Sequence, residues 1–316
     1  MSAFAFVTPT WDPAPWASAL SKAAPKLDIR IWPDKLQRVD DISYAAAWLP
    51  PPNVLKGFPN LKVIFSLGAG VDAILSDSTL PAHIPIVRVN DPDLTNRMSE
   101  YIVMHVLMHH RQQRRIEANQ RNGVWDGFPT HAAKDMTVGI MGLGVLGQDA
   151  ALKLKMMGFD VVGWSRSPKH IAGIECFAGK SEQSIFLNKT DILVCLLPAT
   201  AETDGIINGN LIAQLSRKGP FGAPVLINAG RGRQQVEPDI LAALDSGALY
   251  AASLDVFGQE PLPPSSRFWQ HPKVFLSPHA AADSDPLTIC RYVAAQITRF
   301  ELGLPLDNLV DRMRGY

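Results

Sequence analysis

The chain has 316 residues, which suit two compact domains better than one, and its 47% hydrophobic residues are typical of a globular protein. Lysine plus arginine equals aspartate plus glutamate at 30 each, so the neutral chain offers no electrostatic footprint for nucleic acid or for an anionic membrane surface. The three cysteines are widely spaced, which predicts neither a disulfide framework nor a metal site. No run approaches the roughly 20 apolar residues of a membrane span, and residues 1–9 show no signal-peptide pattern. We therefore expect a cytoplasmic protein.

Short apolar runs that end in Gly, Pro, Asn or Asp recur through the first third of the chain. Each run has the length of a strand, and helical-length segments separate several of them. This alternation predicts a parallel sheet with helices on both faces, in an α/β domain that ends near Arg97. The expected strands are Ala3–Thr8, Leu27–Trp32, Ala45–Leu49, Leu61–Leu67 and Ile84–Val89.

A long helix is predicted next, over Ser99–Asn122. Ser99 is a suitable N-cap, apolar residues recur along one face, and Gly123 ends the helix. The sequence leaves open whether this helix bridges two domains or packs against a second subunit.

A second series of six apolar runs follows. Most of them are continuously apolar, as strands buried on both faces of a parallel sheet are. Six strands with intervening helices predict a doubly wound dinucleotide-binding fold. A last helix, about Leu287–Leu302, comes after this series, and we expect it to return to the first domain. The six runs are Met136–Met141, Asp160–Trp164, Ile192–Leu197, Val225–Asn228, Ala251–Val256 and Val274–Leu276.

A glycine-rich turn follows the first strand of this second series. The motif is Gly142-Leu143-Gly144-Val145-Leu146-Gly147, and Gln148–Met157 after it reads as a helix. Gly142 permits the turn, Gly144 lets backbone approach a pyrophosphate, and Gly147 lets helix pack on strand. The phosphates would lie at the positive end of the helix. The competing interpretation is an ordinary structural turn.

The next strand ends at Trp164, and Ser165-Arg166-Ser167 follows it. An NAD-binding fold usually has an Asp or Glu there to hold the ribose hydroxyls. A guanidinium and two hydroxyls bind a 2′-phosphate instead, through charge-assisted hydrogen bonds. We therefore predict NADPH in preference to NADH, which stays possible. Alternatively, Arg166 is an exposed loop residue.

Three strand-end loops carry side chains that are suited to catalysis. Arg231 lies between two glycines after the strand at Val225–Asn228, where its fork can clamp a carboxylate and polarise a ketone. Glu260 precedes a proline in a second loop, and His279 ends the third. Histidine is the usual proton donor near neutral pH, and a carboxylate partner fixes its tautomer. Taken singly, each residue is more often an ordinary surface or loop side chain.

The chain resembles the D-isomer-specific 2-hydroxyacid dehydrogenase family over nearly its whole length. The resemblance rests on four motifs in the family's order, Gly142–Gly147, Asn228–Gly232, Asp255–Pro261 and Ser277–His279. Within the family the chain is most similar to the bacterial glyoxylate/hydroxypyruvate reductases, through Trp164–Ser167, Pro261–Pro264 and Trp269–Pro272.

The resemblance implies a role for each matching residue on the substrate side. Arg231 matches the arginine that binds substrate and polarises its carbonyl, His279 the acid that protonates the alkoxide, and Glu260 its carboxylate partner. The loop Gly68-Ala69-Gly70-Val71-Asp72 matches the loop whose backbone N–H groups, at Ala69 and Gly70, bind the substrate carboxylate, and successive N–H groups do form anion nests. Trp48 is a candidate for the substrate pocket, although a strand-end aromatic is equally typical of a core, and the loop is otherwise a plain turn.

On the cofactor side, the resemblance places Leu197, Pro198 and Thr203 near the adenosine end, and Ala229 and Asp255 near the nicotinamide. It also implies a homodimer, with Ser99–Asn122 and the loop to His131 as candidates for the interface.

We therefore expect an α/β fold of two doubly wound parallel-sheet domains with a cleft between them. A flavodoxin-like substrate (lid) domain would comprise residues 1–98 and 285–316, and a Rossmann cofactor domain residues 99–284. The expected function is NADPH-dependent reduction of small 2-oxo acids, such as glyoxylate and hydroxypyruvate, to 2-hydroxy acids. The alternatives are a dehydrogenase for another 2-hydroxy acid, or a non-catalytic NAD(P)-sensing protein on the same fold.

Overall fold

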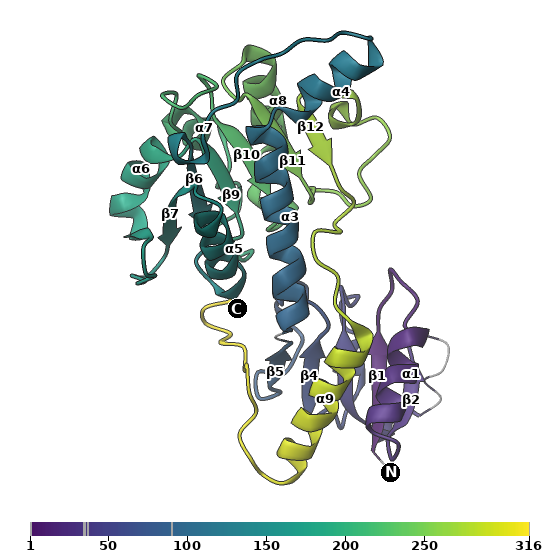
Figure 1. Ribbon diagram of the computed structural model, residues 1–316. Coiled ribbons are helices and arrows are strands. Elements are labelled where there is room, and N and C mark those ends of the chain that lie inside the picture. The colour runs from purple at the N-terminus through teal and green to yellow at the C-terminus, as the bar shows by residue number, and fades with distance from the viewer. Residues whose placement is uncertain (1, 34–35, 37, 90, 316) are drawn as a thin grey trace. The chain divides into compact units, whose positions relative to one another are not determined.

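The computed structural model describes residues 2–33, 36, 38–89 and 91–315, and it divides the chain into two compact units (Figure 1). Unit 1 comprises Met1–Leu94 and Ser284–Tyr316, and unit 2 comprises Thr95–Asp283. None of the helices in the described part of the chain combines the length and the apolar character that crossing a membrane requires. The assignment of substrate and cofactor roles to the two units stays a prediction.

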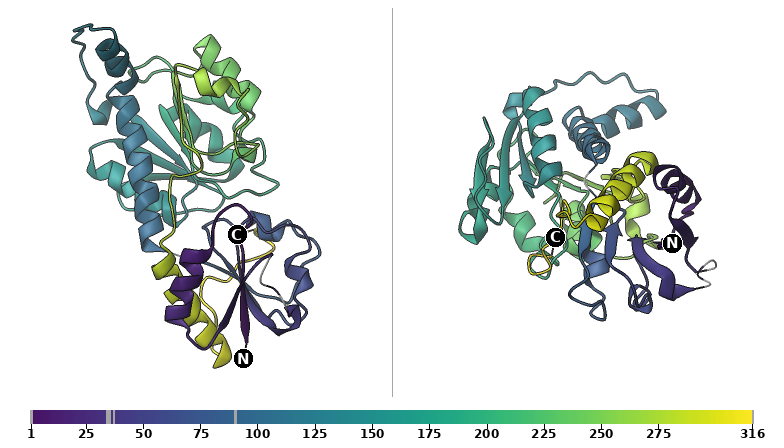
Figure 2. Two further views of the ribbon diagram at one scale, coloured as in Figure 1. Left: turned by 90° about the vertical axis from the view of Figure 1, so that its right-hand side faces the viewer. Right: turned by 90° about the horizontal axis from the view of Figure 1, so that it is seen from below.

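Unit 1 contains a five-stranded parallel sheet in the order β2-β1-β3-β4-β5, which is the flavodoxin-like order. Its strands are β1 (Ala3–Val7), β2 (Asp28–Ile31), β3 (Ile42–Ala47), β4 (Val63–Ser66) and β5 (Ile86–Arg88). Its helices are α1 (Ala14–Ala23), α2 (Asp72–Leu75) and α9 (Pro286–Glu301). Figure 2 shows α1 and α9 side by side on one face of the sheet, so the last helix belongs to unit 1.

The alternation of side chains along β1 explains this layering. Phe4 and Phe6 face a core shared with α1 and α9, while Ala3 and Ala5 face a second core on the other side of the sheet. Every residue of β1 is buried, because helices or loops cover both faces of a parallel sheet.

Unit 2 contains a seven-stranded parallel sheet in the order β12-β11-β10-β9-β6-β7-β8, a doubly wound order whose direction reverses between β9 and β6. The strands are β6 (Thr137–Met141), β7 (Asp160–Ser165), β8 (Glu175–Ala178), β9 (Ile192–Cys195), β10 (Val225–Asn228), β11 (Ala251–Leu254) and β12 (Val274–Leu276). The helices are α3 (Pro92–His110), α4 (Gln113–Arg121), α5 (Val145–Met156), α6 (Gly179–Lys189), α7 (Gly209–Gln214) and α8 (Glu237–Ser246). The predicted fold class is confirmed in both units.

Short 3-10 helices join some of these elements. They lie at Val39–Asp41, Leu55–Gly57, Ala133–Asp135, Gly232–Gln234 and Arg267–Gln270. The fourth of them begins directly after Arg231, so it fixes the backbone on one side of a predicted catalytic residue.

The predicted single helix over Ser99–Asn122 is wrong at its start and in its middle. The helix begins earlier, at Pro92, because Asp91 accepts a backbone N–H of the first turn and proline suits the first helical position. Ser99 therefore lies inside α3 rather than at its N-cap. Gln112 adopts a left-handed φ of 52°, which separates α3 from α4.

The sequence also failed to indicate β8. This strand has four residues at the edge of the sheet, and only Phe177 among them is buried. A short edge strand with exposed polar residues lacks the continuous apolar run that marked its neighbours. In the other direction, β3 begins at Ile42, three residues before the expected start.

Candidate active site

The three predicted catalytic residues follow three neighbouring strands. Arg231 comes after β10, Glu260 after β11 and His279 after β12, and these strands lie in the order β12-β11-β10. Parallel strands bring their carboxyl ends to the same edge of a sheet, which is where ligands bind in doubly wound folds. The topology therefore gathers the three loops at one edge of unit 2.

His279 and Glu260 form a direct pair. Nδ1 of His279 lies 2.7 Å from Oε2 of Glu260, and the backbone N–H of Phe257 donates to Oε1 of the same carboxylate at 2.9 Å. A carboxylate is an acceptor, so the proton of the pair lies on Nδ1 and Nε2 is left for other chemistry.

The charge state of Glu260 follows from the groups around it. Burial opposes its ionisation, but the hydrogen bonds from His279 and Phe257, together with the charges of His279 and Arg231, outweigh burial and lower the pKa of the carboxyl group. The charge of Arg231 is the smallest of these influences. The structure thus pairs His279 directly with Glu260 and places Arg231 after the neighbouring strand, at the same edge of the sheet.

The backbone around His279 is held in an unusual conformation. His279 has a φ of 55°, in the left-handed region that non-glycine residues seldom adopt. Its N–H donates to the carbonyl of Asp255 at 2.8 Å, and the N–H groups of Ala280 and Ala281 donate to the Asp255 carboxylate at 2.9 and 3.0 Å. Asp255 is 1% exposed, so a buried carboxylate holds the turn that presents the imidazole.

The glycine-rich turn has the geometry of a phosphate cradle. Gly142 has a φ of 115°, and a side chain at Gly147 would collide with the carbonyl of Gly142. Open space surrounds the position where Gly144 lacks a side chain, and this residue is the N-cap of α5 without a side-chain hydrogen bond to the helix. Val145 and Leu146 form the first turn of α5. The turn therefore fits a pyrophosphate at the start of a helix.

The loop after β9 adjoins this turn at the reversal of strand order. A side chain at Gly142 would lie 2.7 Å from the carbonyl of Leu196, next to Leu197 and Pro198. Thr203 Oγ1 donates to the carbonyl of Pro198 at 2.7 Å and accepts from the N–H of Thr200 at 2.9 Å, so its visible role is to fold this loop. Ala229 lies between β10 and Arg231 and is buried.

Ser165, Arg166 and Ser167 lie at the end of β7, the strand next to β6. The hydroxyl of Ser165 donates to the carbonyl of Ser167 at 2.8 Å. Arg166 has 48% of its side chain exposed, and its guanidinium lies 3.9 Å from the carboxylate of Glu202. The predicted phosphate-binding loop thus presents a half-exposed guanidinium, which lies loosely beside the acidic Glu202.

In unit 1, the loop Gly68–Asp72 follows β4 and lies against Trp48. A side chain at Gly68 would lie 2.1 Å from the Trp48 ring, so only glycine allows this close approach. The single hydroxyl proton of Ser66 is shared between the carbonyls of Gly68 and Gly70, which lie 3.0 and 2.9 Å from Oγ, and this contact folds the loop tightly. Trp48 and the loop, including Ala69, therefore form one local structure. Their contact with substrate stays a prediction.

Comparison with known proteins identifies the family. The model of "D-isomer specific 2-hydroxyacid dehydrogenase, NAD binding domain" matches residues 103–281, and glyoxylate/hydroxypyruvate reductase A of Salmonella newport is 44% identical over 98% of this chain and 99% of its own length. The chain belongs to the D-isomer specific 2-hydroxyacid dehydrogenase family. The predicted family and enzyme class are confirmed, and the NAD binding domain of the family lies within unit 2.

Two solved structures of the family are similar over the whole chain. The NADPH-dependent glyoxylate/hydroxypyruvate reductase from Sinorhizobium meliloti, in complex with NADP and sulfate, is 49% identical with a TM-score of 0.95, and all of both chains is covered. A probable 2-hydroxyacid dehydrogenase from Rhizobium etli CFN 42, in complex with NADP, HEPES and L(+)-tartaric acid, is 45% identical with a TM-score of 0.92 and the same coverage.

Sequence reasoning missed two buried glutamines that connect the loops of this dehydrogenase. Gln234 accepts the N–H of Arg231 at 2.9 Å and donates to the carbonyls of Leu197 and Pro198 at 2.8 and 3.0 Å. Gln235 accepts from Asn228 and donates to the carbonyl of Val256, at 2.9 and 2.8 Å. The adjacent polar pair after the Arg231 loop was the available signal, because buried glutamines need partners.

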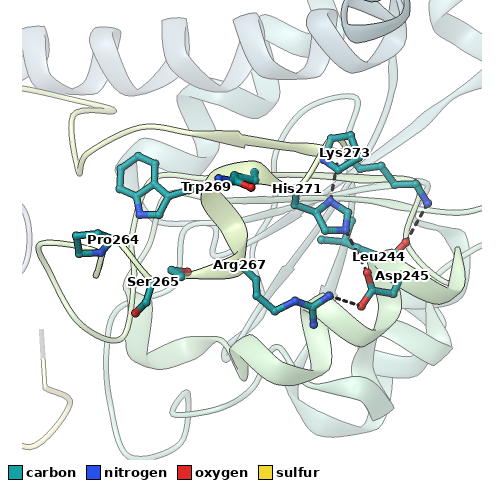
Figure 3. A pocket seen from close by; sticks show the side chains of 11 residues that line it. Leu244, Asp245, Pro264, Ser265, Arg267, Trp269, His271 and Lys273 are labelled. Carbon is teal, nitrogen blue, oxygen red and sulfur yellow. Dashed lines mark hydrogen bonds and ion pairs between the residues drawn. The ribbon is translucent and has the colours of Figure 1, made fainter.

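A surface pocket of about 590 Å³ also lies in unit 2, and Figure 3 shows its lining. Its polar groups pair with one another, since Arg267 donates to Asp245 and Lys273 donates to the carbonyl of Leu244, both at 2.9 Å. Its eleven lining residues include none of the three candidate catalytic residues. These pairs stabilise the carboxyl end of α8, and the pocket is no candidate for the substrate site of the dehydrogenase.

Proposed function

We propose that this chain catalyses the NADPH-dependent reduction of small 2-oxo acids, such as glyoxylate and hydroxypyruvate, to 2-hydroxy acids. The observation that carries the proposal is the His279–Glu260 pair at 2.7 Å, with Arg231 near enough to influence the same carboxylate. The whole-chain likeness to relatives named glyoxylate/hydroxypyruvate reductases supports the substrate class. Unit 2 would bind the cofactor, and unit 1 would serve as the substrate (lid) domain.

The glycine-rich turn and the β7 loop would hold the cofactor. Open space beside Gly144 and the start of α5 suit the pyrophosphate, and Arg166 with its two flanking serines suits a 2′-phosphate. Bound NADPH supplies the hydride. NADH lacks the phosphate that Arg166 would bind, so we propose it as the poorer cofactor. The NADP in the two solved relatives agrees with this choice.

Arg231 would bind and polarise the substrate. Its guanidinium presents several N–H donors in a planar fork, which matches a carboxylate and the adjacent carbonyl oxygen of a 2-oxo acid. The buried Gln234 accepts the backbone N–H of Arg231 and thereby fixes the start of that side chain. Ala69 and Gly70 would contribute backbone N–H groups to the carboxylate, and Trp48 an apolar wall.

His279 would supply the proton. The alkoxide that develops during reduction needs an acid, and Nε2 is the imidazole nitrogen not engaged by Glu260. After donation, the neutral ring keeps its remaining proton on Nδ1, where the Glu260 carboxylate accepts it. In the oxidation direction Nε2 would accept the proton of the 2-hydroxy acid.

We also propose a homodimer, because the segment after α4 exposes apolar side chains. Trp125 is fully exposed and Val124 is 51% exposed. Soluble monomers rarely present such groups together, and a second copy of the chain would cover them. Sedimentation velocity would report a dimer whose dissociation constant rises in a Trp125→Ser variant, and a monomeric wild-type protein would contradict the proposal.

The free cysteines Cys176, Cys195 and Cys290 fit a reducing compartment such as the cytoplasm.

Steady-state oxidation of NADPH and NADH with glyoxylate, hydroxypyruvate and pyruvate tests the function. We expect turnover with the first two acids and a higher kcat/KM with NADPH. Turnover with other 2-oxo acids alone would make the chain a dehydrogenase for a different 2-hydroxy acid. Tight NADPH binding without turnover of any 2-oxo acid would overturn the enzymatic role and identify an NAD(P)-sensing protein.

A further inference from the structure

Tyr101 is a buried titratable residue that the proposed mechanism does not use. It lies on α3, is 8% exposed, and its ring packs against that of His105 with centroids 4.2 Å apart. Its hydroxyl oxygen lies 2.9 Å from Oγ of Ser277, two residues before His279. A residue 176 positions earlier in the chain thus contacts the loop that carries the proposed acid.

The direction of this hydrogen bond follows from the next one. Ser277 Oγ donates its single proton to Oδ1 of Asp255 at 2.6 Å. Ser277 can therefore only accept from Tyr101, and the hydroxyl of Tyr101 is the donor. Burial raises the pKa of Tyr101, which keeps this donor protonated at working pH. The order of donation runs from Tyr101 through Ser277 to the Asp255 carboxylate.

Asp255 is the point at which this chain of hydrogen bonds reaches the catalytic loop. Its carboxylate accepts from Ser277, Ala280 and Ala281, and its backbone carbonyl accepts from His279. The left-handed conformation of His279 is intrinsically unfavourable, so it needs such surrounding contacts to persist. A donor that orders Ser277 therefore also orders the turn.

We propose that Tyr101 is a positioning residue that acts through Ser277 and Asp255 to hold the turn presenting His279. The proposal rests on the proposed role of His279 as the proton donor. Tyr101 touches neither substrate nor cofactor in this account, and its contribution is to the orientation of the acid. Small displacements of a catalytic group reduce the rate of its step while binding elsewhere is unchanged.

The test is Tyr101→Phe in the full chain, which removes one oxygen and keeps the ring. We expect kcat for glyoxylate to fall about 3- to 10-fold, with the KM for glyoxylate and the dissociation constant for NADPH within about twofold of wild type. The slower proton-transfer step would limit kcat to a greater extent, so the solvent deuterium isotope effect on kcat should increase. A purely structural role would not move that isotope effect.

Ser253→Ala is the matched control, because it removes a similar hydrogen bond that another residue of α3, His109, forms with the sheet. Nε2 of His109 lies 2.8 Å from Oγ of Ser253, which lies within β11 and not in the catalytic loop. This variant should lower the melting temperature by a similar amount and leave kcat and the solvent isotope effect at their wild-type values. Equal kinetics of Tyr101→Phe and Ser253→Ala would overturn the proposal.

A second pair of variants keeps the test decisive if Tyr101→Phe folds poorly. Ser277→Thr retains the hydroxyl and should retain most of kcat, whereas Ser277→Ala should show the lowered kcat and the raised isotope effect. Equal kcat values for these two variants would overturn the proposal. The His279→Ala variant separates this outcome from failure of the proposed function. An unchanged kcat in that variant would show that His279 is not the proton donor, whatever Tyr101 does.

Discussion

The two ends of the candidate site in unit 2 are built differently. Buried side chains connect the loops after β9, β10, β11 and β12 by hydrogen bonds, with Gln234 and Asp255 each accepting or donating at least three. The loop after β7 presents Arg166, which is 48% exposed and lies 3.9 Å from a Glu202 side chain that is 68% exposed.

This difference matches two different physical tasks. Proton transfer requires donor and acceptor at a fixed distance and angle, so the acid must be held rigidly. A phosphate dianion is recognised by charge and by hydrogen bonds that a flexible surface side chain can form on binding. Changes to the buried loops should therefore affect kcat, and changes to the β7 loop should affect the choice of cofactor.

Among changes to the buried loops, Arg231→Ala should have the largest effect on activity. It removes a charge-assisted fork, at about 1.5–3 kcal/mol for each hydrogen bond to a charged group, so two such bonds predict that kcat/KM for glyoxylate falls about 10²- to 10⁴-fold. Steady-state kinetics measures the loss. The Arg231→Lys variant keeps the charge without the planar fork, so its kcat/KM should lie between those of the wild type and the alanine variant. Wild-type kcat/KM in the alanine variant would exclude the proposed substrate contact.

Glu260→Gln should lower kcat about 10- to 100-fold, by removing part of a general acid's effect. The Glu260 carboxylate accepts from both Phe257 and His279, whereas an amide has one acceptor and one donor end. Whichever way the amide turns, either the N–H of Phe257 or the Nδ1–H of the protonated imidazole loses its acceptor. The expected protein binds NADPH normally in fluorescence titrations. An unaltered kcat would mean that the pair does not control the acid.

Arg166→Ala should act at the other end, on cofactor choice alone. We expect kcat/KM for NADPH to fall about 10-fold, as one lost charge-assisted hydrogen bond predicts, while that for NADH stays unchanged. Glu202→Gln is the matched control, because removing the acidic neighbour should favour NADPH slightly. Equal losses with both cofactors would place Arg166 away from the 2′-phosphate.

Helix α3, which contacts the loop after β12 through Tyr101, should also respond to acid in a way that the β7 loop does not. Burial lowers the pKa of His105 to about 4, against an ordinary value of 6.5, so the unfolded chain binds a proton that the folded chain rejects between those values. Stability therefore falls as the pH drops from 6.5 to 4. His105→Leu should make the melting temperature fall less steeply over this range. The exposed His170→Leu should not, and parallel curves for both variants would contradict this assignment.

Strand-end position is what made the main site residues predictable. Continuous apolar runs marked the strands before Arg231 and His279, and a parallel sheet must bring such ends to one edge. The polar contacts behind the site were not predictable in this way. Which hydroxyl reaches Asp255, or which carbonyls meet Gln234, depends on contacts between segments far apart in sequence. The interruption between α3 and α4 at Gln112 was likewise not predictable, because neither glycine nor proline occurs at that position.

The most direct test of the account is kcat for NADPH-dependent glyoxylate reduction by the His279→Ala variant, compared with wild type. If the imidazole held by Glu260 donates the proton, kcat should fall about 10²- to 10⁴-fold while the dissociation constant for NADPH is unchanged. A variant that turns over glyoxylate at the wild-type rate would contradict the account.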